Sequence, residues 1–130
     1  MSDYLLDVNV LIAHAIVEHE HHPIVMHRLR QLAAEGCRFH VCPLVELGLV
    51  RNVMRIGSLP IEDARQLLEN EYTNLGLQRI PDDIGASALS GWVRGYRQTT
   101  DAYLSTLAEA HELRLLTIDK GIPGAERLLP

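Results

Sequence analysis

Residues 4–13 read Tyr-Leu-Leu-Asp-Val-Asn-Val-Leu-Ile-Ala and carry the clearest structural signal in the chain. The apolar run Tyr4-Leu5-Leu6 is typical of a buried strand in a parallel sheet. Asp7 ends this run, and from Val8 to Val17 the apolar residues recur at helical spacing. A buried strand that passes at once into a helix predicts the first unit of an α/β fold.

The same alternation of short apolar runs and helical patterns continues to the end of the chain. We expect further strands in four segments: Arg38–Cys42, Leu75–Ile80, Leu113–Ile118 and Glu126–Leu129. We expect further helices over residues 23–35 and 43–56, from 60 through 68, from Asp82-Asp83 through Tyr96, and over 102–112. No Asn-Gly hairpin turn occurs. The pattern therefore predicts a single α/β domain over residues 1–130, with a central parallel sheet of about four to five strands and helices on both faces.

Length and composition exclude several classes of protein. The chain has 130 residues, of which 47% are apolar and 22% are charged, a balance that supports a folded core and argues against disorder. No apolar run is long enough to span a bilayer, and no secretory signal pattern is found. We therefore expect a cytoplasmic protein that has no membrane partner.

The net charge bears on nucleic-acid binding. Twelve basic residues face 17 acidic ones, which gives a formal net charge of −5. An acidic protein is a poor non-specific binder of nucleic acid, because like charges repel at long range. Yet Lys120 is the one lysine among the 12 basic residues, and the arginines that make up the rest suit bidentate phosphate contacts. Composition alone leaves a nucleic-acid substrate open.

Four acidic residues occupy positions that a parallel sheet brings to one edge. Asp7 and Asp119 end predicted strands, and Glu46 and Asp101 lie in the first turns of predicted helices. Ligands bind beyond the carboxyl ends of the strands in such sheets, so the four carboxylates can converge there. A converged set needs a cation, and an all-oxygen set suits Mg²⁺ or Mn²⁺. The alternative is that each acid only caps a helix or complements its dipole.

Four motifs around these acids follow one another along the chain. They are Leu5-Leu6-Asp7-Val8-Asn9-Val10-Leu11-Ile12-Ala13, Cys42-Pro43-Leu44-Val45-Glu46-Leu47, Thr99-Thr100-Asp101-Ala102-Tyr103-Leu104 with Leu107-Ala108, and Leu115-Leu116-Thr117-Ile118-Asp119. In this order they resemble the PIN-domain nucleases, in particular the VapC toxins of bacterial VapBC toxin–antitoxin pairs. The resemblance runs from Leu5 to about Gly121. One departure is residues 120–123, Lys-Gly-Ile-Pro, which replace the commoner basic-x-Phe ending.

The resemblance implies a Mg²⁺-dependent endoribonuclease toxin in which Mn²⁺ can substitute for Mg²⁺. Its catalytic, metal-binding acids would be Asp7, Glu46, Asp101 and Asp119. Asn9 and Thr117 would orient the ligands or a water. A metal-activated water would cut RNA to leave 5′-phosphate and 3′-hydroxyl ends. The family also implies a homodimer and a VapB-like antitoxin partner, with DNA contacted only through that antitoxin.

Several arginines are candidate contacts for RNA phosphates. Arg51 and Arg55 lie four residues apart on the predicted helix of Glu46, and Arg97 lies just before Asp101. These side chains, together with Arg94, could line the approach to the acids. The alternative is that they only form solvated helix faces and salt bridges.

Two other groups of residues have a functional and an ordinary interpretation. His19, His21 and His22 invite a zinc site, but no partner Cys or His occurs at a matching spacing, which favours a surface loop or a partner-contact segment. Trp92 and Tyr96 share a predicted helical stripe. We therefore expect them in the core or in a subunit interface, ahead of a base-stacking role.

Two alternative functions remain beside the nuclease. One is a PIN-like binding module that acts mainly through partner contacts. The other is a Mg²⁺-dependent hydrolase of small phosphoesters on a similar sheet. The intact acids favour catalysis over pure binding. The early pair is Asp7-x-Asn9 and not Asp-x-Asp, which counts against the aspartyl-phosphate type of hydrolase.

Overall fold

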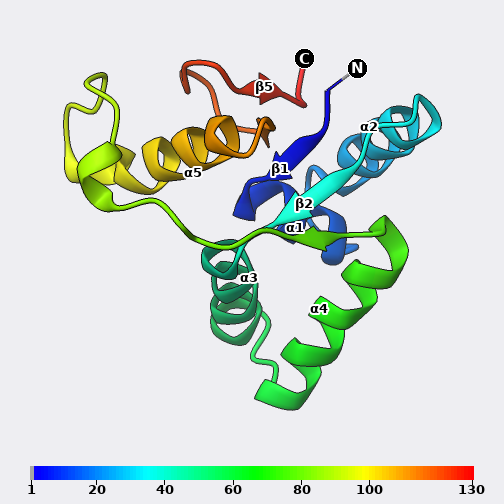
Figure 1. The fold of residues 1–130 in the computed structure, drawn as a ribbon. Helices are drawn as coiled ribbons and strands as arrows, with labels where there is room; N and C mark the ends of the chain where they lie inside the picture. Colours follow the sequence, from blue (N-terminus) through cyan, green and yellow to red (C-terminus); the bar gives the residue numbers. More distant parts are fainter. Residues whose placement is uncertain (1) are drawn as a thin grey trace.

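The apolar run that ends at Leu6 lies at the centre of a sheet in the computed structural model, which describes residues 2–130. The strands are β1 (Tyr4–Leu6), β2 (Phe39–Val41), β3 (Gln78–Arg79), β4 (Arg114–Thr117) and β5 (Glu126–Arg127). All pair in parallel, in the order β3-β2-β1-β4-β5. The neighbouring strands β1 and β2 lie side by side near the centre of Figure 1. The predicted parallel sheet is confirmed. Met1, the first residue of the predicted domain, lies outside the described residues.

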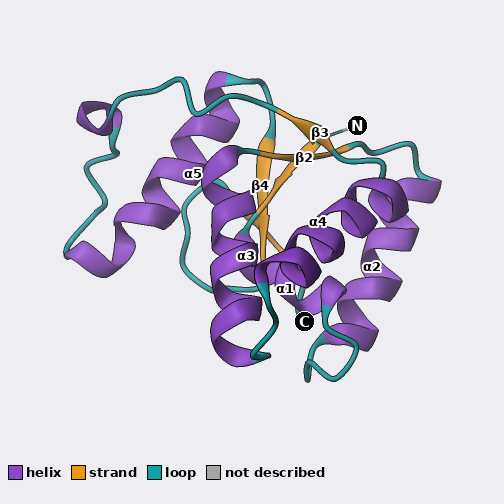
Figure 2. Cartoon of the chain, turned by 90° about the horizontal axis from the view of Figure 1, so that it is seen from below, coloured by secondary structure: helices purple, strands orange, loops and turns teal. Residues whose placement is uncertain are grey.

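Helices cover both faces of this sheet, as predicted. They are α1 (Val8–Ala15), α2 (His22–Ala34), α3 (Pro43–Ile56), α4 (Ile61–Leu75) and α5 (Thr99–Ala110). The first four pack against one another on one side of the strands and α5 lies on the other side (Figure 2). Right-handed crossovers explain this division. The chain moves from β1 through β2 to β3 in one direction, and α5 then carries it back to β4 on the far side of β1.

The two central strands are buried on both faces. Leu5, Leu6, Leu115 and Leu116 are each at most 1% exposed. Burial on both faces explains why the two strands share adjacent apolar residues, Leu5-Leu6 in β1 and Leu115-Leu116 in β4, with no alternation of polar and apolar residues between them. Among residues 2–130, no helix combines the length and the apolar character needed to cross a membrane.

The strand predicted at Leu75–Ile80 is shorter than expected. Helix α4 extends through Leu75, and Gly76 ends it with a φ of 62°, a left-handed conformation that glycine adopts without strain. The Gly76 N–H donates to the Tyr72 carbonyl, which closes the last turn. Gln78 and Arg79 then pair with β2, and the Ile80 N–H donates to the Val41 carbonyl at 2.9 Å where the pairing ends.

The helix predicted from Asp82 through Tyr96 is wrong. The structure has loops there, with two short 3₁₀ turns at Ala86–Ala88 and Tyr96–Gln98. Glycine inside a helix costs about 1 kcal/mol relative to alanine, and the apolar stripe does not offset three such residues. The three are Gly85, Gly91 and Gly95.

The carboxylates that were expected to cap this helix have other partners. Asp82 Oδ2 accepts a hydrogen bond from the Leu44 N–H at 2.9 Å, so it caps the start of α3 instead. Asp83 Oδ1 lies 2.8 Å from His111 Nε2, at the end of α5. Both contacts join segments far apart in sequence, so no local pattern could reveal them.

Helices α1 and α3 approach each other closely at Gly48. A Cβ atom at this position would lie 2.7 Å from Val8 Cγ2 and 3.1 Å from Val8 Cγ1. Val8 is the first residue of α1, directly after Asp7. The absence of a side chain at Gly48 therefore sets the distance between α3 and the residues that follow β1.

We expect Gly48→Ala to lower the melting temperature. Alanine in place of a helical glycine ordinarily stabilises by about 0.5–1 kcal/mol. Here the added methyl group meets a β-branched side chain with little rotational freedom, and overpacking costs about 1–3 kcal/mol. Thermal unfolding of this variant is compared with Gly91→Ala, where nothing lies within 4 Å of the new Cβ. A Gly48→Ala variant more stable than the parent would contradict the close approach.

Candidate active site

Three of the four predicted acids meet at the carboxyl ends of the two central strands. Asp7 follows β1, Asp119 follows β4, and Asp101 lies in the first turn of α5. One ligand oxygen from each lies within 4.8 Å of the others, and among residues 2–130 this is the one such group of three or more His, Cys, Asp or Glu side chains. The chain adds β2 and β3 on one side of β1 and then crosses over to add β4 on the other side. Open α/β sheets bind ligands at such a change in the direction of strand addition.

Asp7 is the most buried of the three aspartates, with 5% of its surface exposed. It is the N-cap of α1, and its Oδ1 accepts a hydrogen bond from the Val8 N–H at 2.7 Å. Its Oδ2 accepts a hydrogen bond from the Thr117 hydroxyl at 2.8 Å. Because both oxygens are held, the carboxylate keeps one orientation beside Asp101 and Asp119.

Asn9 and Thr117 connect the segments that carry these acids. Thr117 Oγ1 accepts hydrogen bonds from Asn9 Nδ2 at 3.3 Å and from the Asp119 N–H at 3.1 Å. Asn9 Oδ1 accepts one from the Ile118 N–H at 3.3 Å. The structure thus places both residues where they can orient Asp7 and the loop of Asp119, the positions that their expected supporting role requires.

The electrostatics of the group favour a bound cation. Burial raises the pKa of Asp7 to about 6, and the negative charges of Asp101 and Asp119 add to this rise. The hydrogen bonds from Thr117 and Val8 act in the opposite direction. Burial and the charge of Asp119 likewise raise the pKa of Asp101. Carboxylates that resist ionisation together become fully ionised when a divalent ion neutralises them.

An open hollow of about 400 Å³ lies over the three aspartates. Helix α3 contributes a wall in which Arg51 and Asn52 offer polar groups. The lining of the hollow comes mainly from the starts of α1 and α5 and from this wall of α3. It consists of Asp7, Val8, Asn9, Ile12, Leu44, Leu47, Gly48, Arg51, Asn52, Thr100, Asp101 and Asp119. A guanidinium beside an acidic group suits a phosphodiester bound through a cation.

Glu46, the fourth predicted acid, lies apart from the aspartates. Its Oε2 accepts a hydrogen bond from the Tyr72 hydroxyl at 2.6 Å, and its Oε1 lies 3.5 Å from Arg79 Nη1. Burial and the contact with Glu46 raise the pKa of Tyr72, so this phenol remains a donor. Leu44 and Leu47 line the hollow. Glu46 is turned about 200° from Leu44 around the helix axis, which directs it toward α4 and β3.

Two of the predicted phosphate contacts lie outside the lining of the hollow. Arg55 donates to Asn52 Oδ1 at 3.1 Å, and Arg97 lies over the Tyr96 ring. Tyr96 itself is 76% exposed, so of the two predicted environments, the core and a subunit interface, the core is wrong for this residue. Because no helix forms there, Trp92 and Tyr96 do not share a stripe, and Trp92 is half-buried.

The histidines after α1 have structural partners. His22 is buried, and its Nδ1 donates to the Ala13 carbonyl at 2.9 Å. His19 Nδ1 accepts a hydrogen bond from the His21 N–H at 3.0 Å. Within the described part of the chain they do not join a group with metal-ligand geometry. The predicted surface loop fits His19 and His21, whereas His22 is buried as the first residue of α2, and no group of these histidines in residues 2–130 supports a zinc site.

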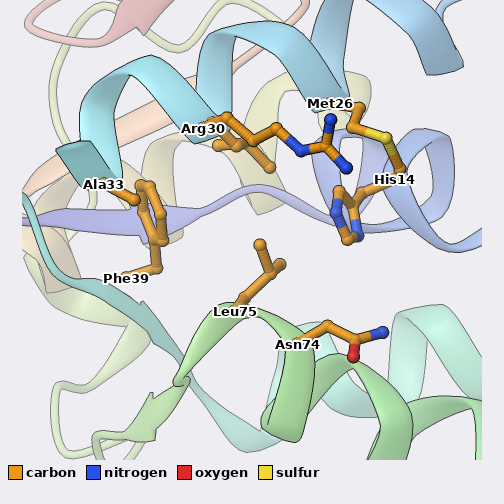
Figure 3. A pocket seen from close by; sticks show the side chains of 8 residues that line it. His14, Met26, Arg30, Ala33, Phe39, Asn74 and Leu75 are labelled. Carbon is orange, nitrogen blue, oxygen red and sulfur yellow. The ribbon is translucent and has the colours of Figure 1, made fainter.

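A second hollow, of about 430 Å³, lies between α2 and α4, and no aspartate of the group lines it. Figure 3 shows Met26 and Arg30 on the α2 side, Asn74 and Leu75 on the α4 side, and His14 at one end. Its polar groups come from three different helices and include no acidic cluster. The chemistry expected of the aspartates therefore belongs to the first hollow alone.

Sequence reasoning missed a buried pair next to this second hollow. His14 Nδ1 lies 2.5 Å from Glu71 Oε2, with the two side chains 10% and 4% exposed. The pair joins α1 to α4 across 57 positions of sequence. No motif marks either residue, since only the packing of the two helices brings them together.

Comparison with known proteins agrees with this geometry. The PIN domain family matches residues 4–128. Ribonuclease VapC29 of Mycobacterium tuberculosis is 35% identical over 119 residues, which cover 91% of this chain and 86% of the relative. Ribonuclease VapC38 of the same organism is 37% identical over 123 residues, with the same two shares.

A solved structure shares the fold. It is the crystal structure of VapBC2 from Rickettsia felis bound to a DNA fragment from their promoter, one chain of which matches with a TM-score of 0.66. The match covers 94% of both chains at 18% sequence identity. The overall fold thus recurs where few residues are shared.

Proposed function

Because this chain belongs to the PIN-domain family, we propose that it is a Mg²⁺-dependent endoribonuclease, the toxin of a type II toxin–antitoxin pair. The observation that carries the proposal is the group formed by Asp7, Asp101 and Asp119 at a ligand-binding point of the sheet. Relatives that are 35% and 37% identical bear the name ribonuclease, which supports RNA as the substrate.

The three aspartates fit a hard divalent cation. They offer oxygen donors alone, and the raised pKa of Asp7 marks a carboxylate whose negative charge is poorly compensated by the protein. Mg²⁺ fits this set, and Mn²⁺ can substitute. When bound, such an ion neutralises charge on the phosphate and activates a water for in-line attack.

The residues of the chain hold the reacting groups in place. Asp7 is fixed by Thr117 and the Val8 N–H, so its oxygens need no reorganisation when the substrate arrives. Asn9 keeps Thr117 in position. Arg51 lines the same hollow and would hold a phosphate next to the scissile bond. Cleavage would leave 5′-phosphate and 3′-hydroxyl ends.

Glu46 has a different place in this proposal. Its carboxylate binds Tyr72 and Arg79, so it joins the start of α3 to α4 and β3. In that role it stabilises the wall of the hollow and does not ligate the ion. The proposed metal-binding acids are therefore the three aspartates.

The proposal includes the partners that accompany such a toxin. A VapB-like antitoxin would bind the chain and would provide its only link to DNA. We further propose a homodimer and a cytoplasmic location, where both the antitoxin and the RNA substrate are present.

Cleavage mapping on total RNA tests the activity. We expect discrete cuts with 5′-phosphate ends in Mg²⁺ or Mn²⁺, and none in excess EDTA. Sequencing of the new 5′ ends identifies the cut sites. If RNA stays intact with either ion while the protein still binds an antitoxin, the result would instead favour a PIN-like module that acts mainly through partner contacts.

Thermal unfolding in millimolar Mg²⁺ or Mn²⁺ tests which acids bind the ion. We expect the ion to raise the melting temperature of the parent by about 10 °C, since an ion at 100 times its Kd stabilises by about 2.7 kcal/mol. Asp101→Asn removes a ligand and abolishes this rise. Glu46→Gln keeps it, because Glu46 faces Tyr72 and Arg79. Loss of the rise in Glu46→Gln alone would place Glu46 in the metal site.

A further inference from the structure

Tyr96 is the most exposed of the large apolar side chains in residues 2–130, at 76%, and the one aromatic ring among those that are exposed. It lies in the segment Gly91–Gln98, which contains Arg94 and Arg97 and no acidic residue. The yellow-green chain that leads into α5 loops out from the rest of the molecule (Figure 1). The two arginines suit a negatively charged ligand, and the exposed ring between them suits a ligand that also has an aromatic part.

The position of Tyr96 relative to the aspartates is set by the start of α5. The 3₁₀ turn Tyr96–Gln98 runs directly into this helix, whose residues Thr100 and Asp101 line the hollow of the aspartates. Asp101 follows Tyr96 by five residues, which at the rise of an α- or 3₁₀-helix corresponds to about 8–10 Å along the helix axis. At a rise of about 3.4 Å per nucleotide, this distance corresponds to about two or three stacked nucleotides.

Local hydrogen bonds hold the segment in shape. The Thr99 hydroxyl donates to the Tyr96 carbonyl at 2.6 Å, and the Gln98 N–H donates to the Gly95 carbonyl at 3.1 Å. The Arg94 N–H donates to Gln98 Oε1 at 2.6 Å. Because the backbone is already ordered, binding a ligand here costs less conformational entropy than ordering a mobile loop.

Arg97 orients the ring of Tyr96. The guanidinium carbon of Arg97 lies 5.6 Å from the centroid of this ring, and the Nε of Arg97 donates to the Tyr96 hydroxyl oxygen at 3.2 Å. Arg94 Nη1 donates to the Gly91 carbonyl at 2.9 Å. Residues 94–98 line a shallow hollow of about 350 Å³. Arg97 therefore covers one face of the ring, Tyr96 as a whole remains 76% exposed, and the guanidinium-bearing residues Arg94 and Arg97 line the same hollow.

We propose that a nucleotide flanking the scissile phosphate stacks on Tyr96, while Arg94 and Arg97 contact the adjacent phosphates. This inference rests on the proposed function and assigns Tyr96, Arg94 and Arg97 as contacts for an unpaired part of its RNA substrate. A base in a duplex is already stacked, whereas an unpaired base gains by stacking on an aromatic ring. The positive charge of the segment acts where RNA must approach an acidic site.

Binding of a fluorescein-labelled 12-nucleotide oligoadenylate in EDTA tests the inference without any cleavage. We expect Tyr96→Ala to raise Kd by between about 5-fold and 150-fold, the range for loss of one stacked base. Tyr96→Phe keeps the ring and stays within about twofold of the parent. The matched control is Val17→Ala, which removes a side chain that is 69% exposed on another part of the surface.

Steady-state cleavage of a mapped RNA substrate provides the second measurement. Tyr96→Ala should raise KM and leave kcat nearly unchanged, because the ring contacts the substrate away from the reacting phosphate. Arg97→Gln should reduce the salt dependence of binding by about one phosphate contact.

Three outcomes overturn the inference. In the first, Tyr96→Ala binds the oligonucleotide and cleaves RNA as the parent does. In the second, it changes the oligomeric state measured by light scattering while Kd stays constant, which assigns the ring to a protein interface. In the third, the parent neither binds nor cuts RNA, which overturns the proposed function as well. Metal-dependent cleavage by the parent separates the first two outcomes from the third.

Discussion

Asp7→Asn is expected to lower metal-dependent RNA cleavage at least ~100-fold while the protein stays folded. Loss of one preorganised charged group at a reacting centre costs about 10²–10³ in rate. Asp7 is the acid whose two oxygens are both held, by the Val8 N–H and the Thr117 hydroxyl, next to Asp101 and Asp119. Asparagine keeps the size and one acceptor oxygen but removes the charge that attracts the cation.

The control for this experiment is Asp63→Asn. Asp63 is exposed in the first turn of α4, so this substitution makes the same change in net charge outside the hollow. Initial rates on the mapped RNA substrate are compared in Mg²⁺ and in Mn²⁺, with circular dichroism to verify the fold. The assignment of Asp7 would fail if Asp7→Asn cut RNA as fast as Asp63→Asn.

Asp7→Asn is also expected to change the pH dependence of stability in the absence of metal. The pKa of Asp7 rises from 3.8 to about 6, mainly through burial, so the folded state holds its proton more tightly than the unfolded state. Below the pKa of the unfolded state, Asp7 is protonated in both states and does not lower the free energy of unfolding. Between the two values the unfolded state ionises first, so stability falls as the pH rises. Above about pH 6 the penalty is complete, at about 3 kcal/mol.

The measurement is the difference in unfolding free energy between Asp7→Asn and the parent, taken in EDTA. We expect this difference to shift in favour of the variant by about 2–3 kcal/mol from pH 4 to pH 7. The hydrogen bond from Thr117 that asparagine cannot replace adds an offset that does not vary with pH. Saturating Mg²⁺ should reverse the shift for the parent alone. A difference that stays constant over this range would mean that Asp7 ionises normally when folded.

Local patterns in the sequence predicted most of the fold. The helix over 43–56 was expected with the bounds that the structure has, because Pro43 begins it and its apolar spacing runs to Ile56. The central strands were recognisable because burial on both faces requires adjacent apolar residues, which are Leu5-Leu6 ahead of Asp7 and Leu115-Leu116 ahead of Asp119. Strand ends and helix starts are short-range properties, so the positions of the acids relative to them could be predicted.

The candidate site was predictable in part for the same reason. Asp7 and Asp119 follow adjacent parallel strands, and Asp101 lies in the first turn of the helix that leads to the second of these strands. Glu46 also lies in the first turn of a helix, but this position does not specify which way the side chain points. Its direction depends on how α3 packs against α4 and on the partners Tyr72 and Arg79, which come from residues far along the chain.

By itself the sequence determined an α/β fold with a parallel sheet, and it determined that the four acids lie at strand ends or helix starts along one edge of that sheet. Only the tertiary structure decided that three of those acids meet, that Glu46 turns toward Tyr72, and that Asp82 caps α3. It also decided that Tyr96 is exposed beside the start of α5. Periodicity and capping act over a few residues, whereas these contacts join residues tens of positions apart and form only when the helices and strands have packed.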